Sequence, residues 1–109
     1  MNITNLTLTE TLEALKNGDF NEEELNKAYL DRIDIINPKL NVFLEVKINK
    51  KGVPAAIKDI ISTQNIKTTA GSKILSTYIP PFNATVVDRL LDRGISVIGK
   101  TNLDEFAMG

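Results

Sequence analysis

Two lysines follow apolar runs that are typical of buried strands, and they are the residues best placed to do chemistry. Lys58 follows Ala55-Ala56-Ile57, and Lys100 follows the apolar stretch Ile95–Gly99. Reactive groups in open α/β sheets gather outside the carboxyl ends of the strands. A desolvated lysine there has a lowered pKa and can act as a base near neutral pH. The alternative, which the pattern alone favours for Lys58, is a strand-end lysine that extends its ammonium group to water.

Alternation along the strand separates Lys58 from the charge next to it. Lys58 shares a face with Ala56, whereas Asp59 points the other way with Ile57, because successive side chains of a strand point to opposite faces. The two charges are therefore not expected to form a simple neighbouring pair.

Lys100 is a weaker candidate than Lys58. Gly99 before it and Asn102 after it are explained by a turn from strand to helix, so replacing Lys100 by Arg is expected to be mild. A polar cluster that could bind a ligand lies in a loop earlier in the chain, at Thr68, Thr69, Gly71 and Ser72. Hydroxyl groups are common in loops, so this cluster is not specific.

Composition narrows the chemistry that the chain can do. Among 109 residues there is no Cys and no His, which excludes thiolate nucleophiles, imidazole bases, disulfides and the usual zinc ligand sets. Thirteen Lys and Arg stand against 14 Asp and Glu, a net charge of -1. This balance disfavours a basic nucleic-acid-binding module or a membrane-binding surface. Any catalysis must use Ser, Thr, Lys, Tyr or carboxylates.

No segment of the sequence is typical of a membrane span or a targeting signal. The apolar runs are a few residues long, far below the roughly 20 residues that cross a bilayer. The start, Met1–Asn5, has neither a cationic leader nor an apolar stretch. We therefore expect a cytoplasmic protein with no membrane contact.

Two helices are predicted in the first part of the chain. The first begins with a capping box at Thr7 and ends at Gly18, and the second begins with a capping box at Asn21. Pro38 is expected to end the second helix, because proline disfavours helical backbone at the residue before it.

The pattern changes to strands after Pro38. Leu40–Val46 and Val53–Ile61 are predicted strands, and the apolar run within the second indicates burial on both faces. A helix over Ala84–Arg93, capped by Asn83, then leads to a strand at Ile95–Gly99. A helical crossover between two strands favours a parallel pair.

These elements predict an α/β fold with N-terminal helices followed by the first strands of a mixed, mostly parallel sheet. We expect a single incomplete domain over residues 1–109, with one modest core. Residues 1–38 form its helical region, and residues 39–109 form the start of the α/β core. Asn102 and Glu105 predict one more helix, beginning at Leu103.

Four segments, in chain order, resemble the amidase signature family. They are Gly52–Asp59 (GVPAAIKD), Thr68–Leu75 (TTAGSKIL), Ala84–Val87 (ATVV) and Gly99–Gly109 (GKTNLDEFAMG). Each motif is modest alone, but coincidence does not explain four in the family order. The resemblance covers almost the whole chain and implies the amidase signature fold.

The resemblance implies a Ser–cis-Ser–Lys triad in which Lys58 is the catalytic lysine. Both serines of the family lie in a Gly/Ser-rich stretch that would follow Gly109, so we expect this chain to be an N-terminal piece that is inactive alone. Lys58 would take a proton through the bridging serine and activate the nucleophilic serine for attack on an amide. Backbone amides of the absent stretch would stabilise the oxyanion.

The ending Asp104–Gly109 is most similar to the glutamine-hydrolysing subunits of tRNA-dependent amidotransferases, because general amidases often have proline where Asp104 stands. This similarity implies glutamine as the substrate and two partner subunits, B and C. Ammonia would pass to a partner that activates glutamate on tRNA with ATP. The tRNA would be reached only through the complex, and no cofactor or metal is expected in this chain.

Two alternatives remain open: another amidase of the same family, or a non-catalytic binding module that kept the scaffold. The sequence also departs from the family pattern in two places. Family members usually have a helical segment where only Glu45–Lys51 intervene here, and Ile60 stands where Asn is more common. A Gly/Ser-rich stretch in frame after Gly109 would favour the enzymes over the module.

Overall fold

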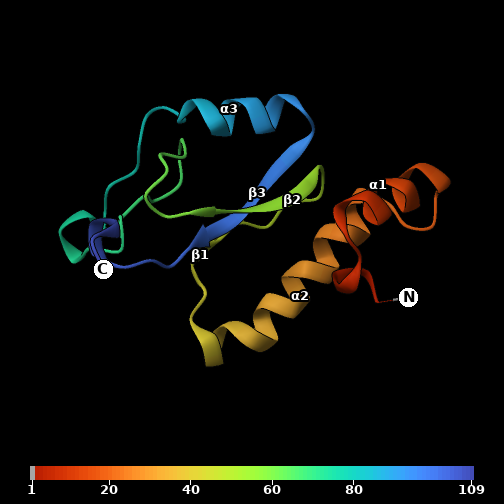
Figure 1. The fold of residues 1–109 in the computed structure, drawn as a ribbon, viewed down its shortest axis with the longest axis horizontal. Helices are drawn as coiled ribbons and strands as arrows, with labels where there is room; N and C mark the ends of the chain where they lie inside the picture. The colour runs from red at the N-terminus through yellow and green to blue at the C-terminus, as the bar shows by residue number, and fades with distance from the viewer. Residues whose placement is uncertain (1) are drawn as a thin grey trace.

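The computed structural model describes residues 2–109 and contains an open three-stranded sheet between helices (Figure 1). The helices are α1 (Leu8–Asn17), α2 (Glu22–Leu40) and α3 (Thr85–Asp92), and the strands are β1 (Phe43–Val46), β2 (Val53–Lys58) and β3 (Ile95–Thr101). Three short 3-10 segments accompany them, η1 (Ile3–Asn5), η2 (Lys73–Leu75) and η3 (Glu105–Ala107). The fold class predicted from the sequence is confirmed.

The sheet is mixed, with strand order β1-β3-β2. β2 runs parallel to β3, as predicted from the α3 crossover, and β1 runs antiparallel to β3. One face of the sheet is covered by α3 and the other lies toward α2 (Figure 1). Because β1 and β2 run in opposite directions, β1 ends at the edge where β2 begins, and residues 47–52 are enough to connect them.

Both predicted capping boxes are present. The Thr7 hydroxyl accepts from the Glu10 backbone N–H at 3.2 Å, and the Glu10 carboxylate accepts from the Thr7 N–H at 3.0 Å. This hydrogen bonding lowers the pKa of Glu10. Asn21 and Glu24 form the same arrangement at the start of α2. These contacts join residues three apart, which is why the sequence predicts them well.

The prediction that Pro38 ends α2 is wrong. Pro38 lies in the last turn, and the helix continues to Leu40 before Asn41 adopts a left-handed conformation with φ 51°. Proline so near the end removes only one N–H, and the last turn still closes because the Asn41 N–H donates to the Asn37 carbonyl at 2.7 Å. The first strand therefore begins at Phe43 rather than at Leu40.

Three other element boundaries differ from the prediction. β2 ends at Lys58 instead of Ile61, and β3 extends two residues beyond Gly99 to Thr101. Asn83 does not cap α3. Its side-chain oxygen accepts from the Gln64 N–H at 2.7 Å and its amide donates to Asp88 at 2.9 Å, so Ala84 takes the cap position.

No helix begins at Leu103 in the described residues. The Asn102 side-chain oxygen accepts from the N–H of Leu103 at 2.9 Å instead of reaching Glu105. Phe106 and Ala107 have φ values of 51° and 57°, in the left-handed region that interrupts a helix. The capping signature predicted there is overridden by a contact with a distant residue, because the Phe106 N–H donates to the carbonyl of Ala70.

The hydrophobic interior forms two clusters rather than the single core expected from chain length. One joins α1 and α2 through Ala14, Phe20 and Leu25. The other joins the sheet and α3 through Ile57, Val87 and Val97. The α2 face of the sheet is not closed, and Ala56 is exposed there, so the predicted burial of β2 on both faces is wrong for residues 2–109.

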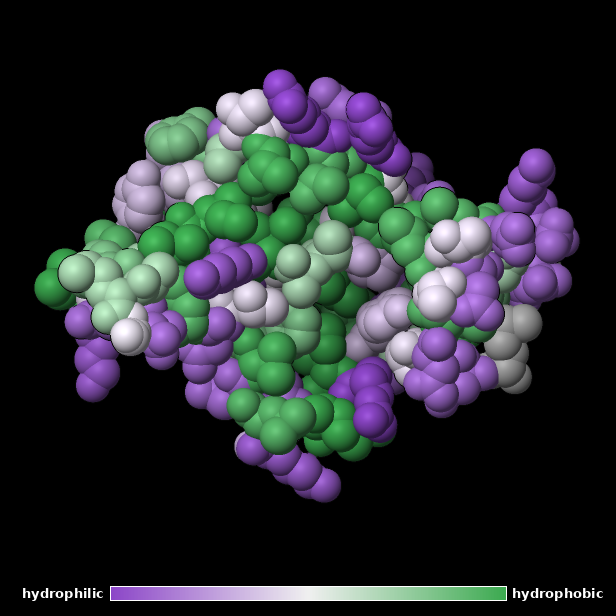
Figure 2. All heavy atoms as spheres, viewed as in Figure 1, coloured by the Kyte–Doolittle hydropathy of each residue, from purple (hydrophilic) through white to green (hydrophobic). Residues whose placement is uncertain are grey.

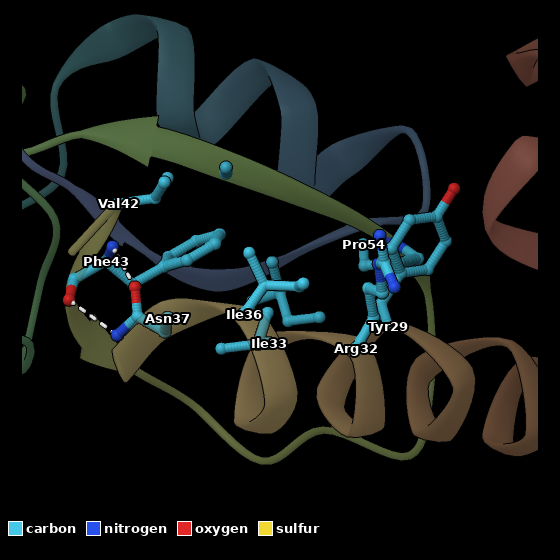
Figure 3. Close-up of a pocket in the computed structure, with 10 residues that line it drawn as sticks. Tyr29, Arg32, Ile33, Ile36, Asn37, Val42, Phe43 and Pro54 are labelled. Atoms are coloured by element: carbon cyan, nitrogen blue, oxygen red, sulfur yellow. Dashed lines mark hydrogen bonds between the residues drawn. The ribbon is translucent and has the colours of Figure 1, made fainter. Parts of the chain in front are cut away.

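Two polar attachments hold α2 to the sheet. Near its beginning, the buried Asn26 side chain donates to the Gly52 carbonyl at 2.8 Å, and the Glu22 carboxylate accepts from the Gly52 N–H at 2.7 Å. Near its end, the Asn37 side chain bonds both the N–H and the carbonyl of Phe43 (Figure 3). None of the described helices is long and apolar enough to cross a membrane.

Candidate active site

Lys58 is the last residue of β2 and its side chain is exposed. It makes no ion pair or side-chain hydrogen bond with any residue from 2 to 109. Ile57 and Asp59 on either side are buried beside the α3 face, whereas Lys58 shares the α2 face with Ala56. The predicted alternation is therefore confirmed. The apolar surroundings expected around the amine are not supplied by the described residues.

An open apolar groove lies on that face, between α2 and the sheet (Figure 3). Its volume is about 340 Å³. The helix contributes Ile33 and Ile36, and the sheet side contributes Phe43 and Ala56. Lys58 itself does not line the groove, but it comes two residues after Ala56 on the same face of β2.

Lys100 has the opposite surroundings, because it is fully buried on the α3 face of the sheet. Its ammonium donates to the Ile61 carbonyl at 2.9 Å and to the Thr68 hydroxyl at 3.0 Å. It also lies 3.3 Å from the Asp59 carboxylate, which is equally buried. The prediction that a turn alone explains Lys100 is wrong. Both lysines lie at the carboxyl ends of parallel strands, but on opposite faces.

Burial lowers the pKa of Lys100, although the attraction of Asp59 and its hydrogen bond act in the opposite direction. Taking the ammonium out of water is therefore only partly offset by its partner. The ion pair is not a stabilising surface bridge but a tightly packed polar centre. Such a centre is strongly disturbed when either partner is removed.

Asp59 is the central residue of this arrangement. One carboxylate oxygen accepts from the Thr69 N–H at 3.1 Å and also from the Thr69 hydroxyl. The backbone N–H of Asp59 donates to the Thr101 carbonyl at 3.0 Å, and its carbonyl accepts from the Ala70 N–H at 2.8 Å. The residue next to Lys58 is thus fixed by both its side chain and its backbone.

The polar loop that the sequence offered as a ligand site is used internally. Thr68 bonds Lys100, Thr69 bonds Asp59, and the Ser72 hydroxyl accepts from the N–H of Ile74 at 3.3 Å. The two threonines hold the loop against the strand ends, and Ser72 caps the short η2 segment. The described residues contain no group of three or more carboxylates placed to hold a metal ion.

The same loop holds the last described segment of the chain. The Ala70 carbonyl accepts from the Phe106 N–H at 2.8 Å. Gly71 lies so close to Leu103 that an added Cβ would be 2.8 Å from the Leu103 carbonyl oxygen, and its φ is +67°. Glycine is required by both conditions. These contacts bring residues 103–108 to the edge of the sheet that carries Lys58.

Sequence reasoning therefore predicted that Lys58 lies at a strand end, but missed the pair of Asp59 and Lys100. The signal was present in part, because alternation already placed Asp59 on the Ile57 face. The missing step was the register of β2 and β3, in which Ile57 lies opposite Lys100 and Lys58 lies opposite Thr101. A register shift at Ala55 and Ala56 sets this alignment, and no local pattern reveals it.

Comparison with protein families agrees with the fold and the motifs. The family described as Amidase matches residues 24–109 of the chain. The chain therefore belongs to the amidase family, and its α/β architecture agrees with that class.

Similarity to individual proteins is more specific. The chain is 42% identical to the A-subunit of glutamyl-tRNA(Gln) amidotransferase from Thermoanaerobacter pseudethanolicus, with all of the chain and 26% of that protein aligned. The crystal structure of the A-subunit of the same enzyme from Thermotoga maritima has a TM-score of 0.86 and 40% identity, covering 98% of this chain and 25% of that one. An amidase family protein of Bacillus anthracis has a TM-score of 0.83 at 28% identity, covering 94% of this chain and 25% of that one.

The chain thus spans about a quarter of the length of the relatives that it matches. Within the matched region the Thermoanaerobacter relative is longer, because the alignment extends over 129 positions against 109 residues here. About twenty positions of the alignment therefore have no counterpart in this chain.

Proposed function

We propose that the chain supplies the catalytic lysine, Lys58, of a glutamine-hydrolysing subunit that serves a tRNA-dependent amidotransferase. The observation that carries the proposal is the Gly52–Asp59 motif at the end of β2, in a chain 42% identical to such a subunit. The proposal places the two serines of the triad in protein outside residues 1–109. We further propose that the complex contains two more subunits, B and C, and uses ATP.

In the proposed reaction the neutral amine of Lys58 accepts a proton from the bridging serine, which takes the proton of the nucleophilic serine. The serine oxygen attacks the side-chain amide carbon of glutamine, and the C–N bond then breaks as ammonia leaves with the returned proton. Water hydrolyses the acyl-enzyme to glutamate. The open α2 face beside Lys58 leaves room for the serine-bearing segment, and residues 103–108 approach the same edge of the sheet.

The test measures ammonia release from glutamine by the chain reassembled with the segment that carries the serines. Replacing Lys58 by Ala should abolish turnover. Lys58→Arg should be nearly as damaging, because a guanidinium keeps its proton and cannot serve as a base. Near-parental activity of Lys58→Arg would contradict the proposed role.

Controls separate this function from the alternatives. Residues 1–109 alone should release no ammonia, since a base without its nucleophile and oxyanion donors retains little transition-state stabilisation. Lys51→Met, at an exposed lysine outside the site, should leave turnover unchanged. Hydrolysis of simple amides but not of glutamine would indicate another amidase of the family. No turnover of any amide by the reassembled protein would favour a binding module.

A further inference from the structure

The buried pair of Asp59 and Lys100 has no role in the reaction proposed above, yet it adjoins the proposed base. Asp59 directly follows Lys58, and its carboxylate lies 3.3 Å from the Lys100 ammonium with both side chains fully buried. A buried pair of this kind is weak evidence for stability, because desolvation opposes the attraction. The arrangement therefore calls for another explanation.

The contacts of this pair join three segments that are far apart in the sequence. Lys100 reaches the Ile61 carbonyl and the Thr68 hydroxyl, and Asp59 holds the Thr69 N–H and hydroxyl. The neighbouring Ala70 connects the backbone of Asp59 to that of Phe106, through bonds of 2.8 Å on each side. The end of β2, the loop at 68–70 and the segment at 103–108 are thereby fixed relative to one another.

The side chain of Lys58, at this junction, is exposed and makes no hydrogen bond or ion pair with residues 2–109. Its backbone lies between β2 and the fixed Asp59, and its side chain points to the opposite, open face. Movement of the amine is then limited to rotation about the side-chain bonds of Lys58 itself. A base must reach the hydroxyl group at hydrogen-bond distance. It does so more often when the backbone that carries it is held in place.

We propose that the buried pair of Asp59 and Lys100, together with the half-buried Thr69, forms a clamp that positions Lys58 against the segment leading to its reaction partners. The three are positioning residues and do not touch the substrate. This inference rests on the proposed function for its catalytic consequence. The mechanical part, a fixed Lys58, depends only on the hydrogen bonds and the ion pair of these residues.

The decisive comparison is Thr69→Val against Thr69→Ser in the reassembled protein that hydrolyses glutamine. Valine keeps the shape of the side chain but removes the hydroxyl that donates to Asp59, whereas serine keeps it. We expect Thr69→Val to lower kcat about tenfold with KM changed by less than about threefold, and Thr69→Ser to remain near the parent. Lys100→Met should give a larger loss of kcat, and Lys51→Met none.

A second measurement reads the position of Lys58 without any turnover. The acetylation rate of the Lys58 amine by acetic anhydride is measured by mass spectrometry, with the exposed Lys51 in the same molecule as the reference. The rate ratio should change about threefold or more in Thr69→Val and stay at the parental value in Thr69→Ser, since surroundings control lysine reactivity.

The two measurements give distinct outcomes. If Thr69→Val lowers the melting temperature but keeps both the parental kcat and the parental labelling ratio, the clamp serves stability alone and the inference is overturned. If the parent shows no glutamine hydrolysis while the labelling ratio changes as expected, the clamp is supported and the proposed function fails. If Lys100→Met does not fold, the pair of Thr69 variants still decides.

Discussion

At the scale of single residues, two lysines with similar neighbours in the sequence have opposite surroundings. Each follows an apolar run near the carboxyl end of its strand, but Lys58 faces the open side of the sheet and Lys100 is fully buried on the α3 face. The motif predicted which lysine matches the family. The surroundings could not be predicted, because they depend on the register between β2 and β3 and on a loop more than thirty residues upstream of Lys100.

The burial of Lys100 changes what its substitution should do. A guanidinium is larger than an ammonium group and has more N–H donors than the acceptors around Asp59 can satisfy. Lys100→Arg should therefore be damaging rather than mild. Lys100→Met leaves Asp59 buried without its partner, which typically lowers the free energy of unfolding by about 3–5 kcal/mol. Removing both charges in Asp59→Asn/Lys100→Met should recover part of that loss. Chemical denaturation at neutral pH measures all three variants, and a loss below about 1 kcal/mol for Lys100→Met contradicts the burial.

At the scale of elements, short-range signals were predicted and long-range ones were not. Both capping boxes and the parallel pairing of β2 with β3 were predicted, because each depends on residues close in sequence or on one crossover. The cap expected at Asn83 was wrong because its side chain is engaged by Gln64. The helix expected at Leu103 was wrong because Phe106 bonds Ala70. Tertiary hydrogen bonds decided both cases.

The connection between β1 and β2 is short in this chain. Residues 47–52 cross from β1 to β2 at one edge of the sheet, past the start of β3. An excursion of about twenty residues is not needed to make this connection. It can therefore be absent without changing the strand order.

We expect an insertion at this connection to be tolerated. Twenty Gly/Ser residues placed between Lys50 and Lys51 lengthen a six-residue loop about fourfold, which costs about 1.3 kcal/mol in loop-closure entropy. The same insert after Ile98, inside β3, should prevent folding because it breaks pairing with both neighbouring strands. Urea unfolding compares the two chains. Equal destabilisation by both inserts would show that the short connection is essential.

At the scale of the whole molecule, residues 2–109 form a sheet with one face closed and one face open. The α3 face carries a core of Ile57, Val87 and Val97, whereas the α2 face leaves a groove lined by apolar side chains. Hydrophobic residues reach the surface across the middle of the molecule, between α3 and α2 (Figure 2). Contiguous apolar surface favours association with other protein, and the outer edges of β1 and β2 have no strand partner in the described sheet.

Residues 1–109 in isolation should therefore self-associate at micromolar concentration, through the groove and the free strand edges. Two adjacent isoleucines of α2 can show whether association occurs through the groove or through any exposed apolar side chain. Ile36 lines the groove, whereas Ile35 lies outside it and is 62% exposed. Ile36→Lys should reduce association, because a charge in the groove opposes its burial, and Ile35→Lys should have little effect. Sedimentation velocity distinguishes them. A parent chain that is a monodisperse monomer and unfolds cooperatively would show that the open face is stable in water.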